Sequence, residues 1–237
     1  MKLSAPIYCL KQKARVISRE ESIPLHQALD RVAVGEGFGG WSLLVSKASA
    51  IAPAGKLYAQ LQPGDLLLLG ARPGQGKTLM SLELAVEAMR SKNRSVFFSL
   101  EYTDKDCLDR FRAIGVDLAE FDGLFEFDGS DAISAEHIVD RLASAPNGTL
   151  AVIDYLQLLD QRRGTPELMD QVRGLKSFAR ERGVTMVFIS QIDRSYHPAT
   201  KPCPDLEDIR LPNPLDLSLF DKTCFMHNGE VRFKAAG

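Results

Sequence analysis

The apolar positions of this chain recur with two different periods, and these periods predict its secondary structure. From about residue 56 onward, short continuous apolar runs alternate with longer stretches in which apolar residues recur at helical spacing. The runs predict strands near residues 65–70, 95–100, 149–154 and 184–190, and the periodic stretches predict helices near 78–92, 104–114, 134–145 and 166–182. Such alternation is typical of an α/β fold with a mostly parallel sheet and right-handed crossovers.

Residues 1–52 show helical spacing alone and predict a small helical module in front of a larger domain at residues 56–237. A second helix is expected to begin at Ser22, with Pro24 in its first turn, and Trp41 starts a third short helix and anchors the core. The segment Pro53-Ala54-Gly55 marks the boundary. Because so short a unit has a marginal core, we expect it to dock on the larger domain or on a neighbouring subunit.

The last 45 residues of the chain combine two kinds of segment. Residues 193–218 are rich in proline and polar side chains and predict a long surface loop. The dipeptide Asn228-Gly229 lies between two alternating segments, which is a strong signal for a β-hairpin.

Composition narrows the possible functions only slightly. The chain has 237 residues, 45% of them hydrophobic and 25% charged, with a net charge of −2. Any contact with nucleic acid must therefore come from local basic patches. No apolar run reaches the roughly 20 residues that span a bilayer, so we expect a cytoplasmic protein that does not insert in a membrane. The four cysteines and four histidines show no metal-ligand spacing.

The most informative motif follows the first predicted strand. Residues 71–78 read A-x-x-x-x-G-K-T, between a strand and a helix, and this pattern predicts a phosphate-binding P-loop. Main-chain amides at the helix start would surround phosphate oxygens, Lys77 would reach the β- and γ-phosphates, and Thr78 would ligate Mg²⁺. The expected cofactors are ATP and Mg²⁺. The expected nucleotide-binding residues are Ala71, Arg72, Pro73, Gly74, Gln75, Gly76, Lys77, Thr78 and Leu79.

Three further predicted strands end in polar side chains that suit the same chemistry. Asp154 ends an apolar run and is expected to hold Mg²⁺ through water, although alone it would read as an ordinary strand-end turn residue. Glu101 would orient and deprotonate the attacking water. A competing interpretation places Glu101 in the first turn of a helix that starts near Thr103. Gln191 would contact the γ-phosphate without repelling it.

These motifs, taken in order, resemble the ATPase domain of DnaB-type hexameric replicative helicases in the RecA-like superfamily. The resemblance covers roughly residues 56 to 237 and rests on specific segments. They are Leu61-Gln62-Pro63-Gly64-Asp65, Ser99-Leu100-Glu101, Ile153-Asp154-Tyr155-Leu156-Gln157-Leu158, Ser190-Gln191 and Pro204-Asp205-Leu206-Glu207-Asp208.

The resemblance implies a role for each matching residue. Lys77 and Thr78 would bind phosphate and magnesium, Glu101 would be the catalytic base, Asp154 the Walker-B acid, and Gln191 the γ-phosphate sensor. It also implies a homo-oligomeric ring, usually of six subunits, with nucleotide at each interface and single-stranded DNA in the central channel. A basic cluster of this size is more often a solvated face, and the candidates for DNA contact are Arg162, Arg163, Arg173, Arg194 and Lys201.

Two departures from the family leave a second function open. The long amino-terminal domain and the linker helix of the replicative helicases do not fit into 52 residues. The basic pair that reaches a neighbour's γ-phosphate in the family has only Arg232 and Lys234 as candidates, in reversed order, and both also read as solvated positions. The leading prediction is an ATPase of helicase type that couples hydrolysis to DNA. The alternative is a RecA-like regulatory or assembly ATPase that uses nucleotide as a switch.

Overall fold

The computed structural model describes residues 4–5, 7–45, 53–160, 166–211, 213–228 and 230–235. Within these residues, seven strands form one sheet in the order β3-β2-β4-β5-β1-β6-β7. All neighbouring strands are parallel except β6 and β7, which form an antiparallel hairpin. The predicted α/β class with a mostly parallel sheet is confirmed. The strands are β1 (Leu66–Ala71), β2 (Ser95–Ser99), β3 (Phe125–Asp128), β4 (Leu150–Asp154), β5 (Thr185–Gln191), β6 (Lys222–His227) and β7 (Glu230–Ala235).

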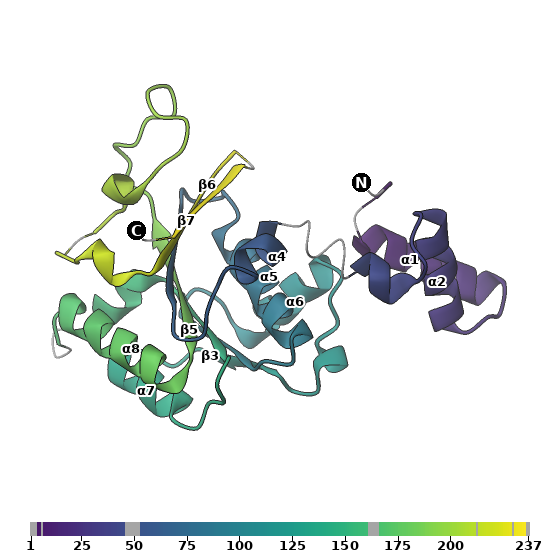
Figure 1. Ribbon diagram of the computed structural model, residues 1–237, viewed down its shortest axis with the longest axis horizontal. Coiled ribbons are helices and arrows are strands. Elements are labelled where there is room, and N and C mark those ends of the chain that lie inside the picture. The colour runs from purple at the N-terminus through teal and green to yellow at the C-terminus, as the bar shows by residue number, and fades with distance from the viewer. Residues whose placement is uncertain are drawn as a thin grey trace.

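Helices cover both faces of this sheet (Figure 1). One face is covered by α4 (Pro53–Tyr58), α5 (Lys77–Arg90) and α6 (Asp104–Ala113), and the other by α7 (Ala135–Leu142) and α8 (Leu168–Arg182). Successive side chains of a strand point to opposite faces, so Leu67 and Leu69 enter one core while Leu66 and Leu68 enter the other. Burial on both faces explains why the central strands read as continuous apolar runs.

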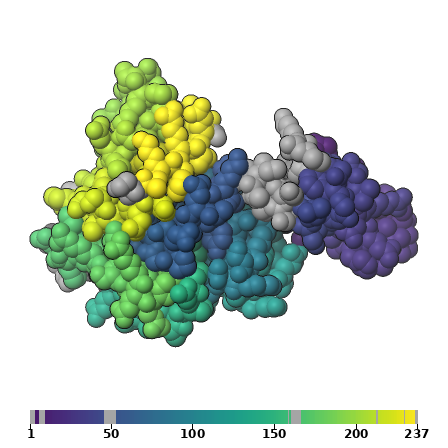
Figure 2. Space-filling model, viewed as in Figure 1, coloured from purple at the N-terminus to yellow at the C-terminus, as the bar shows by residue number. Residues whose placement is uncertain are grey.

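The amino-terminal helices form a separate lobe beside the sheet (Figures 1 and 2). Helix α1 (Ile7–Glu20), helix α2 (Leu25–Gly35) and the helical residues 41–45 enclose a small core. Trp41 packs against its edge, as predicted. The buried members of this core are Leu10, Ala14, Ala28, Val32, Ala33 and Leu44. The domain boundary near residue 52 falls outside the described residues and stays a prediction.

Four local features of the fold correct the predictions or add to them. Helix α2 begins at Leu25 after Pro24, because Ser22 adopts a left-handed φ of 53° in the preceding turn. The segment Pro53-Ala54-Gly55 forms the start of α4, since proline is tolerated at a helix start and Ala54 and Leu57 pack against the core, and its role as a boundary stays a prediction. Strand β3, at the sheet edge, was not predicted from its four residues.

The fourth correction concerns residues 193–218, which are not simply a surface loop. They contain the short 3₁₀ helix η3 (Leu206–Asp208) and the start of a second, η4 (Leu217–Leu219), and Ile209 pairs with Ile192 in a single β-bridge. Tyr196, Cys203 and Leu215 are buried against the α7–α8 side of the sheet. The hairpin predicted around residue 228 is confirmed by β6 and β7. No described helix is both long and apolar enough to cross a lipid bilayer.

Candidate active site

The P-loop connects the carboxyl end of β1 to the first turn of α5. Gly74 and Gly76 have φ angles of 76° and 85°, in the left-handed region that favours glycine. Gly76 is the N-cap residue, and the amides at the start of α5 have no acceptor within the helix. Because those amides carry the positive end of the helix dipole, this turn is built to receive an anion.

The side chain of Lys77 lies along this turn rather than in open solvent. Its Nζ donates a hydrogen bond of 3.1 Å to the carbonyl oxygen of Arg72. Burial lowers the pKa of Lys77, while the charges of Asp154 and Glu101 raise it. The ammonium group therefore lies within electrostatic reach of both carboxylates, as the predicted site requires.

Asp154 is the buried carboxylate of the site, with 3% of its surface exposed at the end of β4. Burial and then repulsion from Glu101 raise its pKa to about 7, against smaller effects of Lys77 and of the Thr78 hydroxyl bonded to it. Its Oδ2 has no hydrogen-bond partner among the described residues. A buried carboxylate oxygen without a partner, beside a threonine hydroxyl and below a phosphate-binding turn, fits a hard divalent cation such as Mg²⁺.

Glu101 lies just beyond the end of β2, where Ser99 is in register with Asp154 on β4. It precedes α6, whose N-cap is Thr103 in a reciprocal capping box with Asp106. Glu101 is therefore not a first-turn residue of that helix. Its side chain is exposed and lines an open cavity of about 420 Å³. Its role as a base stays a prediction, and its position leaves room for a water molecule.

Gln191 ends β5, beside a second cavity of about 280 Å³. Three arginines line this cavity, namely Arg72 of the P-loop, Arg194 and Arg210. The main chain of Arg210 is fixed from two sides, because its amide donates to Gln191 O at 2.8 Å and its carbonyl accepts from Gln157 Nε2 at 2.7 Å. The side chains of Arg194 and Arg210 are exposed, so this corner carries accessible positive charge.

The remaining basic candidates do not gather there. Arg162 and Arg163 lie outside the described residues. Arg173 is exposed on α8, 3.8 Å from Asp170. The ammonium of Lys201 lies 2.7 Å from carboxylate oxygens of both Asp205 and Asp208, and its contact with DNA stays a prediction.

The candidate trans residues lie on the edge strand β7. Arg232 and Lys234 are exposed, while Val231 and Phe233 between them pack partly against the core. Arg232 lies 3.8 Å from Glu230. The strand thus presents both basic side chains outward, and their action on a neighbour stays a prediction.

Sequence reasoning missed two features of this site. Arg210 was overlooked because its signal is only a basic residue next to the Pro204–Asp208 segment, and the β-bridge that brings it to Gln191 is not visible in the sequence. Arg72 was taken only as a P-loop position, but its guanidinium contacts the segment that follows Gln191.

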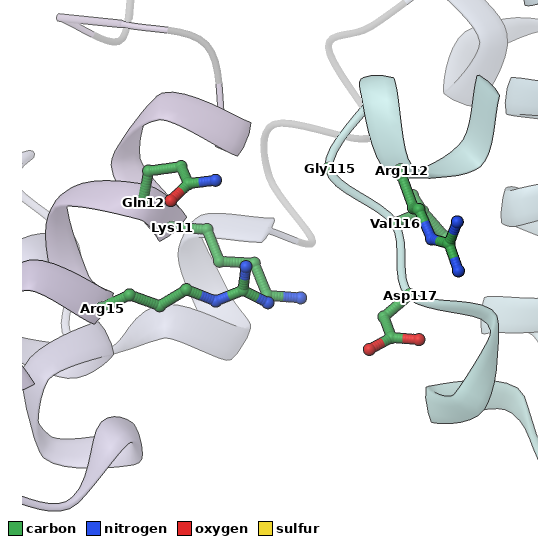
Figure 3. A pocket seen from close by; sticks show the side chains of 7 residues that line it. All are labelled: Lys11, Gln12, Arg15, Arg112, Gly115, Val116 and Asp117. Carbon is green, nitrogen blue, oxygen red and sulfur yellow. The ribbon is translucent and has the colours of Figure 1, made fainter. Parts of the chain in front are cut away.

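A further hollow of about 420 Å³ lies away from the P-loop, between α1 and the segment after α6 (Figure 3). Lys11 and Arg15 extend from the helical lobe toward Asp117 and Arg112 on the main body. Lys11 also pairs with Glu120 at 2.6 Å. This hollow is a junction between the lobe and the sheet domain and contains none of the predicted catalytic residues.

A comparison with protein families identifies the family of this chain. The family model described as the KaiC ATPase matches residues 60–203, which include the P-loop, Glu101, Asp154 and Gln191. The chain belongs to this ATPase family. It is thus a P-loop ATPase with a RecA-like fold, and the expected DnaB-type ATPase domain is confirmed.

Curated relatives of this ATPase carry the name replicative DNA helicase DnaB. The protein of Synechocystis sp. is 30% identical over 181 residues, which are 63% of this chain and 21% of that protein. The protein of Pasteurella multocida is 26% identical over 243 positions, covering 87% of this chain and 51% of the relative. That of Haemophilus influenzae is 29% identical and covers 74% and 45%. The chain thus spans about half or less of the length of these relatives.

A comparison with solved structures supports the fold. The structure titled ATPase domain of G40P superimposes with a TM-score of 0.56 and 20% identity, over 77% of this chain and 81% of that one. At this identity the match establishes the fold of the ATPase and nothing finer.

Proposed function

We propose that this ATPase hydrolyses ATP with Mg²⁺ and couples hydrolysis to movement on single-stranded DNA, as a homo-oligomeric ring that would hold six subunits. One observation carries the proposal. Lys77, Thr78, Glu101 and Asp154 come from three elements and influence one another at a single edge of the sheet, where a buried carboxylate oxygen has no partner.

The residues divide the chemistry among themselves. The amides of the P-loop and the ammonium of Lys77 bind the triphosphate and stabilise the negative charge that grows on the transferred phosphoryl group. Thr78 and, through water, Asp154 hold Mg²⁺, which neutralises phosphate charge when bound. Glu101 orients the attacking water and accepts its proton. Gln191 contacts the γ-phosphate and passes its loss to the segment that follows β5.

The proposed DNA contact rests on the cavity beside Gln191. Arg194 and Arg210 present exposed guanidinium groups there, and such groups bind phosphodiesters irrespective of sequence. The relatives' name, replicative DNA helicase, supports the same partner. In the ring, nucleotide lies between subunits, and the outward Arg232 or Lys234 of one subunit reaches the nucleotide of the next.

The catalytic assignment is tested by single-turnover hydrolysis with Glu101→Gln. We expect turnover to fall by roughly 10²-fold or more while nucleotide binding is kept. Near-wild-type turnover would remove Glu101 from the mechanism. The matched control is Glu136→Gln, which changes an exposed carboxylate in the first turn of α7.

The DNA coupling is tested by steady-state ATP hydrolysis with and without a single-stranded oligonucleotide. We expect the oligonucleotide to stimulate turnover, and Arg210→Ala to weaken this response and its salt dependence. Arg19→Ala on α1 serves as a control for the loss of one exposed arginine. An unchanged rate of ATP hydrolysis with the oligonucleotide in the wild type would contradict the coupling.

A second function is favoured by the charge of the protein. The net charge is −2 and Lys201 is neutralised by two carboxylates, so little basic surface remains for a DNA strand. In this alternative the ATPase uses nucleotide as a switch for assembly. ATP-dependent ring formation on a sizing column, with no response to the oligonucleotide, would establish it over the motor.

A further inference from the structure

The P-loop is tied by a side chain to the segment that follows Gln191. Arg72 Nη2 donates to the carbonyl oxygens of Arg194 and Tyr196, at 3.1 and 2.9 Å. The same guanidinium lies over the Tyr196 ring, 5.6 Å from its centre. One planar group therefore makes two charged hydrogen bonds and a stacking contact, a geometry that lysine cannot reproduce.

The segment that Arg72 holds, residues 193–209, is folded rather than loose. Tyr196 is 3% exposed, its hydroxyl donates to Lys201 O at 2.8 Å, and its ring meets the edge of His227 on β6. Lys201 in turn bonds Asp205 and Asp208. The Asp193 amide closes the segment on the carbonyl of Asp208 at 2.7 Å. These contacts connect Tyr196 to both ends of the segment, so we expect a displacement at Tyr196 to move the segment as a unit.

The main chain of Arg72 is connected to the phosphate-binding group. Lys77 Nζ donates to the carbonyl oxygen of Arg72, and this carbonyl also accepts from the amide of Gln75. Phosphate oxygens would compete with that carbonyl for the ammonium of Lys77. Arg72 thus lies between the group that binds the triphosphate and the segment beside Gln191.

From these contacts we propose that Arg72 is a positioning residue, which couples occupation of the P-loop to the placement of residues 193–209. The proposal rests on the function proposed above and deepens it, because it names a connection from the phosphates to the 193–209 segment that does not pass through Gln191. In this proposal Arg72 acts through residues 193–209, while the contact with DNA is assigned to Arg194 and Arg210.

Amide hydrogen exchange tests this coupling with the whole chain and a non-hydrolysable ATP analogue plus Mg²⁺. In the wild type, the analogue slows exchange in the P-loop and in residues 193–209, each by about fivefold or more. In Arg72→Lys, it still slows exchange in the P-loop, but the change in residues 193–209 falls below about twofold. In Arg72→Gln, which keeps an amide donor but loses the charge, the change in residues 193–209 also falls below about twofold, and this variant serves if the lysine variant does not fold.

The control is Arg182→Lys, because Arg182 also donates to a main-chain carbonyl, that of Ala143, at the end of α8 far from the P-loop. We expect it to respond like the wild type. If residues 193–209 respond in both Arg72 variants as they do in the wild type, the coupling is overturned. It is also overturned if, in the wild type, the analogue slows exchange in the P-loop but not in residues 193–209. Either outcome leaves the nucleotide site in place. An analogue that slows exchange in neither region would overturn the nucleotide site and the coupling with it.

Discussion

At the carboxyl edge of the sheet, buried polar atoms lie without partners, whereas every buried side chain described in the amino-terminal lobe is apolar. Asp154 Oδ2 and Ser190 Oγ have no hydrogen-bond partner, and two P-loop glycines have positive φ. The lobe instead buries six aliphatic side chains and keeps its charges at the surface, as in the pair of Arg31 and Glu21. Buried side-chain atoms without a partner also occur at Arg94, Ser95 and Gln157, so it is the place of Asp154, below the phosphate-binding turn and beside the Thr78 hydroxyl, that indicates a ligand site.

The same difference separates function from stability. Burial of charged groups at the carboxyl edge of the sheet lowers the free energy of unfolding, and a bound ligand offsets that loss. The lobe has a small core and meets the main body through few contacts, among them Lys11 with Glu120. We therefore expect changes at the edge to alter activity and changes in the lobe to alter local folding.

The largest effect is expected from Lys77→Ala. Removing the ammonium from the phosphate site should lower kcat/KM for ATP by roughly 10³-fold, because the charge that develops on the phosphoryl group loses its nearest cation. Phosphate release measures the loss, and a preserved thermal transition shows that the fold is intact. Lys56→Ala, which removes an exposed lysine of α4, should leave the rate unchanged.

The second effect is a pH dependence of stability from Asp154. In the fold its pKa is raised from 3.8 to about 7 by burial and by Glu101. Between these values the folded protein binds more protons than the unfolded chain, so without Mg²⁺ the stability falls as pH rises from about 4 to about 7. Above pH 7, Asp154→Asn should therefore be more stable than the wild type, by up to about 4 kcal/mol.

Denaturant unfolding at several pH values with a chelator present measures this difference. Mg²⁺ with nucleotide should favour the wild type instead, since it binds the ionised carboxylate. The exposed Asp131→Asn is the control. Equal stability of Asp154→Asn and the wild type above pH 7 would mean that burial of the ionised carboxylate does not destabilise the fold.

The carboxyl edge of the sheet could be predicted from the sequence, because its strands, its glycine turn and its acidic residues each leave a local pattern. An apolar run ending in Asp154, and a glycine turn before Lys77, need no distant contact to be read. What the sequence could not show depends on tertiary packing. Tyr196 is buried in the core on the α7–α8 side of the sheet, where its ring contacts Arg72 and His227 from distant parts of the chain. The edge strand β3 has only four residues, in which two phenylalanines alternate with two acids. This pattern is too short to distinguish a strand from a loop.

The third effect separates the two regions directly. Leu44 is fully buried in the lobe, and Leu44→Ala should cost about 2–4 kcal/mol locally, enough to unfold so small a core. Circular dichroism should report the loss of helix while ATP hydrolysis by the sheet domain stays within about twofold. The exposed Leu43→Ala serves as the matched control. A collapse of activity with Leu44→Ala would show that the lobe is part of the catalytic unit.

The smallest effect is expected at the junction of the two regions. Lys11→Ala removes the 2.6 Å pair with Glu120, and a surface ion pair of this kind contributes about 0.2–1 kcal/mol. Differential scanning calorimetry at low and high salt should show a small shift that disappears at high salt. A shift of several degrees that salt does not affect would mean that the lobe is held by more than its charges.

The most direct test of the proposed nucleotide site is a crystal structure of Glu101→Gln with ATP and Mg²⁺. We expect the triphosphate on the amides of residues 74–78, the γ-phosphate at Lys77 Nζ, and the cation on the Thr78 hydroxyl with Asp154 reaching it through water. Nucleotide bound anywhere else on the protein, or a turn closed by side chains under saturating nucleotide, would contradict it.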